Sequence, residues 1–153
     1  MTWEDLQTNI YYIDGSLRDI YALNVTHKEW ENWIDLVNEK YIVEFYNGKT
    51  EKIESKIDKN LIFECWYRNA DFTCNVRVKL DSIFIKCYFF AETEIENDIT
   101  PKEIISIEDH NKLVKYLTDF SNAIGKKVIL TPETSASIEL ISVENNTVKI
   151  IDI

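Results

Sequence analysis

The chain has 153 residues, which is the size of one ordinary domain and too short for two. Asp and Glu outnumber Lys and Arg by 27 to 17, and the net charge of −10 argues against nucleic acid and anionic membrane surfaces as partners, because both are themselves negative. Only three glycines and two prolines occur, which excludes collagen-like chains and argues against a glycine-rich phosphate-binding loop. We therefore expect a single globular domain over residues 1–153.

The cysteines and the first residues bear on where the protein works. Cys65, Cys74 and Cys87 are odd in number and none belongs to a Cys-x-x-Cys pair, so we expect reduced thiols rather than a disulfide framework or a zinc site. Residues 1–5 are polar and acidic, unlike a signal or transit peptide, and no run approaches the roughly 20 apolar residues that span a bilayer. These features predict a cytoplasmic protein that does not enter a membrane.

The first 25 residues predict a short helix and a β-hairpin. Residues 2–8 suit a single helical turn. Residues 10–13 and 17–25 flank the sequence Asp-Gly-Ser, in which Gly15 can adopt the positive φ of a tight turn. We expect the two flanking runs to pair as neighbouring strands.

Residues 27–39 predict the first long helix. Thr26 and Glu29 have the spacing of a capping box, in which each side chain satisfies a backbone N–H of the first turn. Trp30 and Trp33 follow on the apolar stripe of that helix. We interpret both tryptophans as core anchors, and stacking on a ligand is the alternative.

Strand patterns follow in the middle of the chain. Residues 41–46 and 50–57 flank an Asn-Gly pair at Gly48, which is typical of a hairpin with a type I′ turn. Residues 62–67 are expected to form a third strand. Residues 74–80 alternate apolar and polar side chains, as a half-buried strand does.

Residues 83–90 are apolar on both faces, which indicates a central strand partly covered on each side. Acidic residues then alternate with other residues from 92 to 98. If this segment continues as a strand, all four of its carboxylates project from one face. A helical turn is expected at 100–103, where Thr, Pro and Glu occupy the positions that favour a helix start.

The C-terminal third predicts the second long helix and three strands. Ser106 and Asp109 offer a helix start, the apolar periodicity runs over 107–124, and Gly125 is a natural stop. A short strand is expected at 128–130. A final hairpin then pairs 138–143 with 147–151.

These elements define the expected fold class. Strands succeed one another through short turns, and helices do not alternate regularly with them. We predict an α+β fold: a curved, mostly antiparallel sheet of about seven to nine strands with two main helices packed on one face.

Negative charge is concentrated ahead of the second long helix. Residues 92–109 hold seven acids and one base, which is −6 of the total −10. Some of these acids suit helix N-termini, and the others create a field that would attract a cationic partner. Aromatic residues at 88–90 could supply apolar anchors. The residues that we expect to contact such a partner are Glu92, Glu94, Glu96, Asp98, Glu103 and Tyr88.

The single α+β domain, the abundant Trp and Tyr, and the acidic stretch 92–99 resemble the small acidic immunity proteins of bacterial toxin–immunity systems. The resemblance lies in the overall character of the whole chain. Such proteins neutralise a toxin, commonly a nuclease, by covering its basic active site. The resemblance implies a non-catalytic protein that needs no cofactor and docks a basic protein partner.

Several alternatives stay open on the sequence. The acids could serve solubility alone, or residues 92–98 could bind Ca²⁺ or Mg²⁺ although the EF-hand spacing is missing. Two carboxylates in a cleft would make a small hydrolase. His27 and His110 match no nucleophile pattern, and we interpret both as surface or cap residues. A homodimer could form through an exposed sheet edge, for which the apolar residues of the last hairpin, Ile150, Ile151 and Ile153, are candidates.

Overall fold

The computed structural model describes residues 1–67 and 71–152. The described helices are α1 (Trp3–Asn9), α2 (His27–Lys40), α3 (Lys59–Tyr67) and α4 (Ile107–Ile124), with a 3₁₀ turn, η1 (Pro101–Glu103). The strands are β1 (Arg18–Ala22), β2 (Ile42–Asn47), β3 (Lys52–Glu54), β4 (Asn75–Leu80), β5 (Ile83–Cys87), β6 (Ile95–Ile99), β7 (Val128–Pro132), β8 (Ile141–Glu144) and β9 (Thr147–Ile150).

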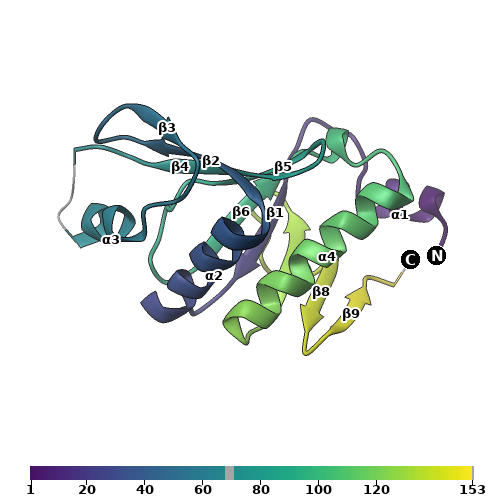
Figure 1. Cartoon of the computed structure of the whole chain (residues 1–153). Helices are drawn as coiled ribbons and strands as arrows, with labels where there is room; N and C mark the ends of the chain where they lie inside the picture. Colours follow the sequence, from purple (N-terminus) through teal and green to yellow (C-terminus); the bar gives the residue numbers. More distant parts are fainter. Residues whose placement is uncertain (68–70, 153) are drawn as a thin grey trace.

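The nine strands form one open antiparallel sheet in the order β3-β2-β4-β5-β6-β1-β7-β8-β9. The helices α2 and α4 lie against each other on one face of this sheet (Figure 1). This arrangement confirms the expected α+β class with two main helices on one face. None of the helices in the described part of the chain combines the length and the apolar character that crossing a bilayer requires.

The two long helices form where local signals predict them. Thr26 and Glu29 make the capping box of α2, and Ser106 accepts a hydrogen bond from the backbone N–H of Asp109 at the start of α4. Gly125 ends α4 with a φ of 68°, a left-handed conformation that glycine adopts without strain. The apolar stripes of both helices face the sheet.

The core lies between the sheet and these helices. Trp30 and Trp33 are completely buried, as their expected role as core anchors requires. The Trp33 indole N–H donates to the hydroxyl of Tyr116, which in turn donates to Asn97 on β6. These hydrogen bonds pair the Trp33 indole N–H and the Tyr116 hydroxyl deep in the interior. The Nδ2 atom of Asn97, in contrast, is buried without a hydrogen-bond partner among the described residues.

The expected hairpin at the N-terminus is wrong, because residues 10–13 form no strand. β1 already has β6 on one side and β7 on the other, which leaves it no free edge. The buried guanidinium of Arg18 instead donates to the carbonyls of Ile10 and Tyr12 and holds this segment as an irregular loop.

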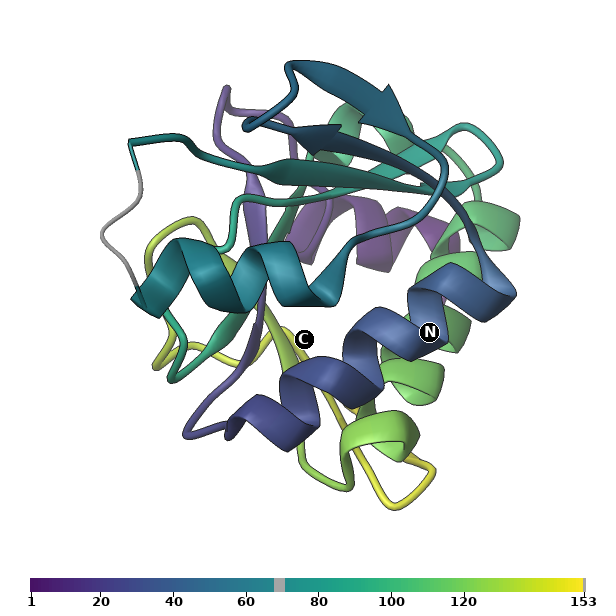
Figure 2. The same cartoon turned by 60° about the vertical axis from the view of Figure 1, so that its left-hand side comes forward.

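The expected strand over 62–67 is also wrong, because α3 occupies this segment. The Asp58 carboxylate accepts from the backbone N–H of Leu61, which is the hydrogen bond of a helix cap. α3 packs beside α2 (Figure 2), where an ion pair joins Lys59 to Asp35 at 2.7 Å. The helical spacing of the buried Leu61 and Ile62 with the half-buried Trp66 explains why the segment is not extended.

The hairpin around Gly48 forms, but its turn is longer than the expected type I′ turn. β2 and β3 are joined by four residues, and the residue with positive φ is Glu51 rather than Gly48. A Cβ at position 48 would lie 1.9 Å from the carbonyl oxygen of Thr73. Glycine is therefore required here by close packing and not by backbone conformation.

The expected final hairpin is confirmed by β8 and β9.

Candidate functional site

The acids of β6 project from the face of the sheet opposite α2 and α4. Ile95, Asn97 and Ile99 point into the core, and the side chains of Glu96 and Asp98 alternate with them. The half-buried Glu94 immediately precedes the strand. The expected alternation thus places three of the four predicted carboxylates, those at 94, 96 and 98, along one face.

Strand pairing adds a fourth carboxylate to this face. Asp98 lies directly across from Asp19 of β1, and Glu96 lies across from Tyr21. Like charges at directly opposed positions of antiparallel strands repel each other. We refer to Asp19, Glu94, Glu96 and Asp98 as the acidic patch.

Positive charge near the acidic patch is sparse. Lys86 of β5 is the strand partner of Asp98 on its other side, but the two side chains form no ion pair. Within residues 1–67 and 71–152, no lysine, arginine or histidine nitrogen comes within 4.0 Å of the carboxylates of Glu94, Glu96 or Asp98. These three acids are therefore not neutralised by direct pairing inside the fold.

The titration of the acidic patch reflects this environment. Burial, followed by the negative charge of Asp19, raises the pKa of Asp98 to about 6, and Lys86 only partly opposes the rise. Burial also raises the pKa of Glu96, and the neighbouring acids Asp19, Glu94 and Asp98 add to the effect. The ionised form of Asp98, which prevails well above pH 6, therefore carries an energetic cost to the fold.

Asp19 is the buried member of the acidic patch. Its Oδ2 atom accepts a hydrogen bond of 2.7 Å from the backbone N–H of Thr134 and one of 3.2 Å from the Tyr21 hydroxyl. Thr134 has a φ of 58°, which a β-branched residue seldom adopts. The segment after β7 thus bends sharply and places a donor over Asp19.

The other two acids that the sequence singles out lie elsewhere. Glu92 sits in a turn, where its carboxylate is 2.9 Å from the His27 imidazole and its backbone carbonyl accepts from Trp30. Glu103 lies in η1 and accepts the backbone N–H of Phe84, at the start of β5. Both side chains serve contacts within the fold, and the structure does not bring them together with the acidic patch.

Tyr88 lies next to the acidic patch. It directly follows β5, and the residue is 41% exposed. Burial raises the pKa of its hydroxyl, and the negative charge of Asp98 adds to this rise. The ring stacks on that of Phe90 with the centroids 5.4 Å apart. The predicted aromatic contact residue is thus exposed beside Asp98.

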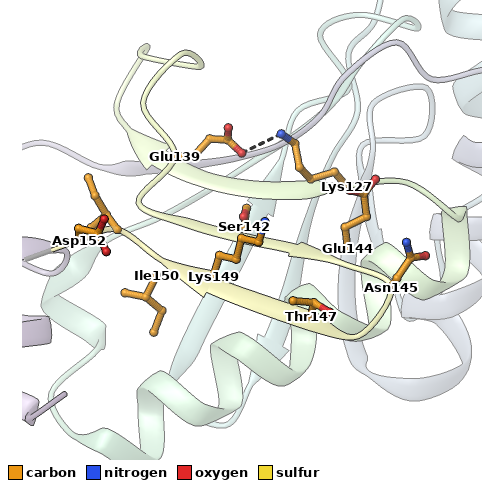
Figure 3. A pocket seen from close by; sticks show the side chains of 10 residues that line it. Lys127, Glu139, Ser142, Glu144, Asn145, Thr147, Lys149, Ile150 and Asp152 are labelled. Carbon is orange, nitrogen blue, oxygen red and sulfur yellow. Dashed lines mark ion pairs between the residues drawn. The ribbon is translucent and has the colours of Figure 1, made fainter.

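Two hollows in the described surface are candidates for further chemistry. One, of about 760 Å³, lies on the β8–β9 hairpin, where Lys127 pairs with Glu139 at 2.9 Å (Figure 3). Its acids and bases are mixed, so it offers no charge of one sign. The second, of about 550 Å³, lies between α3 and the end of β5 and includes Trp66, Tyr88 and Phe90 in its walls. Neither hollow is lined by the acids of β6.

The histidines and cysteines show no catalytic arrangement. His110 lies in the first turn of α4, as the cap interpretation expects, but it is buried rather than at the surface. Its Nδ1 atom makes a 2.7 Å hydrogen bond with the Tyr11 hydroxyl in the core. Burial lowers the pKa of His110. All three cysteines are free, and Cys74 and Cys87 are buried. Among the described residues, no group of three or more His, Cys, Asp or Glu side chains is arranged to hold a metal ion.

Asp19 could not be assigned to the site from the sequence. The pairing of β1 with β6, which brings Asp19 next to Asp98, joins segments some 80 residues apart and leaves no local pattern in the sequence. Comparison with family models, with curated proteins and with solved structures finds no match to the chain.

Proposed function

We propose that the chain is a non-catalytic binding protein whose acidic patch and Tyr88 dock a basic protein partner. The observation that carries this proposal is the line of half-buried, directly unpaired carboxylates on an open sheet face. Such charges destabilise the fold that holds them, and features that break local rules of stability are concentrated at functional sites. A cation supplied by a partner would remove the repulsion.

Charge and anchoring support the same partner class. The net charge of −10 accelerates encounter with a basic surface, and the acidic patch provides a local target. Tyr88 supplies an exposed aromatic ring of the kind that contributes strongly at protein interfaces. In the immunity interpretation, the partner is a toxin whose basic, phosphate-binding site is covered by these acids.

A hydrolase is the less favoured alternative. That function requires two carboxyl groups facing each other across a cleft. Asp19 and Asp98 are adjacent, but neither lines any of the hollows described above, and Asp19 is buried beneath the Thr134 backbone. The observations therefore favour recognition over hydrolysis.

The experiment is affinity capture from the native host with a matched pair of variants. The triple variant Glu94→Gln, Glu96→Gln, Asp98→Asn removes three of the four charges of the acidic patch and leaves the buried Asp19. Glu92→Gln removes a nearby acid that faces His27 instead. We expect the wild type and Glu92→Gln to retain one basic protein at about 0.1 M NaCl and to release it as salt screens the contact. The triple variant should bind the purified partner about tenfold more weakly or worse. Equal retention by the triple variant, or recovery of no basic protein, would refute the proposal.

A further inference from the structure

The hollow between α3 and β5 is an aromatic cavity. Three segments line it: one side of α3, the chain before β4 and the chain after β5. Its volume of about 550 Å³ lies within the range of sites that enclose a ligand or a large side chain. The described lining residues carry no formal charge: Ile62, Cys65, Trp66, Phe72, Thr73, Cys74, Asn75, Tyr88, Phe89 and Phe90.

The rim of this cavity is built by a strained residue. Phe89 has a φ of 56°, which is unusual for a bulky side chain and costs conformational energy. This conformation buries the Phe89 ring against Trp30 and Trp33. The flanking rings of Tyr88 and Phe90 are directed outward, and Phe90 is 72% exposed. The fold thus holds two large aromatic rings in solvent at the mouth of an apolar hollow.

Tyr88 connects the aromatic cavity to the acidic patch. Tyr88 lines the cavity, and it comes two residues after Lys86, which lies directly across from Asp98. Tyr88 is therefore the residue that links the cavity to the strand next to the acidic patch. An aromatic hollow whose described lining is uncharged, together with the negative charge of the nearby strand β6, favours a partner group that is apolar and has a cation adjacent to it.

We infer that the aromatic cavity receives an aromatic side chain of the basic partner, from a segment in which lysine or arginine flanks that side chain. The inference rests on the proposed function and identifies the feature of the partner that the surface would select. The aromatic side chain packs among Trp66, Tyr88 and Phe90, while the flanking cation lies over the acidic patch.

Two small probes separate the cavity from the charge. Indole tests the cavity alone, and the capped tripeptide acetyl-Lys-Trp-Lys-amide tests the cavity and the acidic patch together. Both are titrated into ¹⁵N-labelled protein and followed by NMR. The Trp66 indole N–H donates to the carbonyl of Phe89 at 2.9 Å, so its signal reports from within the cavity wall.

The two variants form a matched pair, because each removes one exposed aromatic ring. Phe90→Ala removes a ring at the rim, and Tyr67→Ala removes a ring that is 73% exposed at the end of α3 and does not line the cavity. We expect indole to shift the Trp66 signal saturably in wild type and in Tyr67→Ala, with binding at least about fivefold weaker in Phe90→Ala. The tripeptide should bind more tightly than indole, and this advantage should disappear in Glu96→Gln, Asp98→Asn.

The outcomes distinguish the two proposals. If indole causes no saturable shift at Trp66, or if Phe90→Ala and Tyr67→Ala behave alike, the cavity inference fails whatever the tripeptide does. If indole binds but the tripeptide gains nothing from Glu96 and Asp98, the link between cavity and charge fails and the proposed function loses its support. Binding of both probes with the expected variant pattern supports the inference.

Discussion

Asp98 lies half-buried on β6 with Asp19 directly across from it, and its pKa is raised to about 6 from an ordinary value of 3.8. A raised pKa means that the folded state holds this proton more tightly than the unfolded state. The contribution of Asp98 to the free energy of unfolding therefore falls as pH rises from about 4 to about 6, and the loss is complete above that range.

Replacing Asp98 by Asn should consequently stabilise the protein at neutral pH. We expect a gain of about 1 kcal/mol at about pH 7.5, an amount reduced for the partial exposure of the carboxyl, and no gain near pH 4, where the wild-type group is already protonated. Urea denaturation at both pH values measures the difference, with Glu92→Gln as the control. A loss of stability in Asp98→Asn at pH 7.5 would show that the ionised carboxylate has a favourable partner in the fold.

For single residues, the sequence could predict that a residue is important more readily than it could predict the contact that makes it so. Gly48 was recognisable as a turn glycine, yet its necessity comes from the Thr73 carbonyl that lies against it. The alternation at 94–98 placed three acids on one face, because that depends only on the period of a strand. Asp19, the fourth member, could not be assigned, because strand pairing over a long separation leaves no local pattern.

Among the elements, Arg18 of β1 has a structural role that the whole N-terminal loop depends on. Its side chain is completely buried and has no carboxylate partner within hydrogen-bond range in the described chain. The guanidinium donates instead to Ile10, Tyr12, Ser16 and Leu17, and it lies 3.9 Å above the Tyr12 ring centroid. These bonds join the segment after α1 to the middle of the sheet.

Arg18→Lys should therefore be strongly destabilising although charge is conserved. An ammonium group has three donors and no planar fork, so it cannot satisfy these separated carbonyls together. We expect a loss of about 2–4 kcal/mol in the free energy of unfolding, measured by urea denaturation. Arg77→Lys is the matched control, since Arg77 is partly exposed and pairs with Glu44, and it should cost less than about 1 kcal/mol. Equal losses in the two variants would show that the fork of donors at Arg18 is unimportant.

The elements that were predicted correctly have complete local signals. α2 and α4 begin at caps and carry apolar stripes over three or more turns, and the β8–β9 hairpin turns through Asn145 and Asn146, which both have positive φ. α3 was missed because its apolar run is short, and a short run fits a strand as well as a buried helix. The loop at 10–13 was missed because β1 is satisfied by distant strands.

For the whole molecule, the open sheet leaves two edges, β3 and β9, and raises the question of self-association. The edge strand β3 has three residues, and Ile53 at its centre is 65% exposed. β9 is also short and includes Lys149. Short strands and edge lysines both oppose pairing between sheets, and a net charge of −10 on each copy adds repulsion.

We therefore expect the chain to be a monomer at about 0.15 M NaCl, where charge repulsion is reduced but edge lysines still must be desolvated for pairing. Size-exclusion chromatography with light scattering should give the mass of one chain across a wide range of concentrations. The variant Val148→Lys adds a second cation to β9 and should leave this mass unchanged. A doubled mass that Val148→Lys abolishes would instead identify β9 as a dimer interface. The C-terminal hairpin would then be the main interaction surface of the protein. Of the three isoleucines predicted at this edge, Ile153 lies outside the described residues.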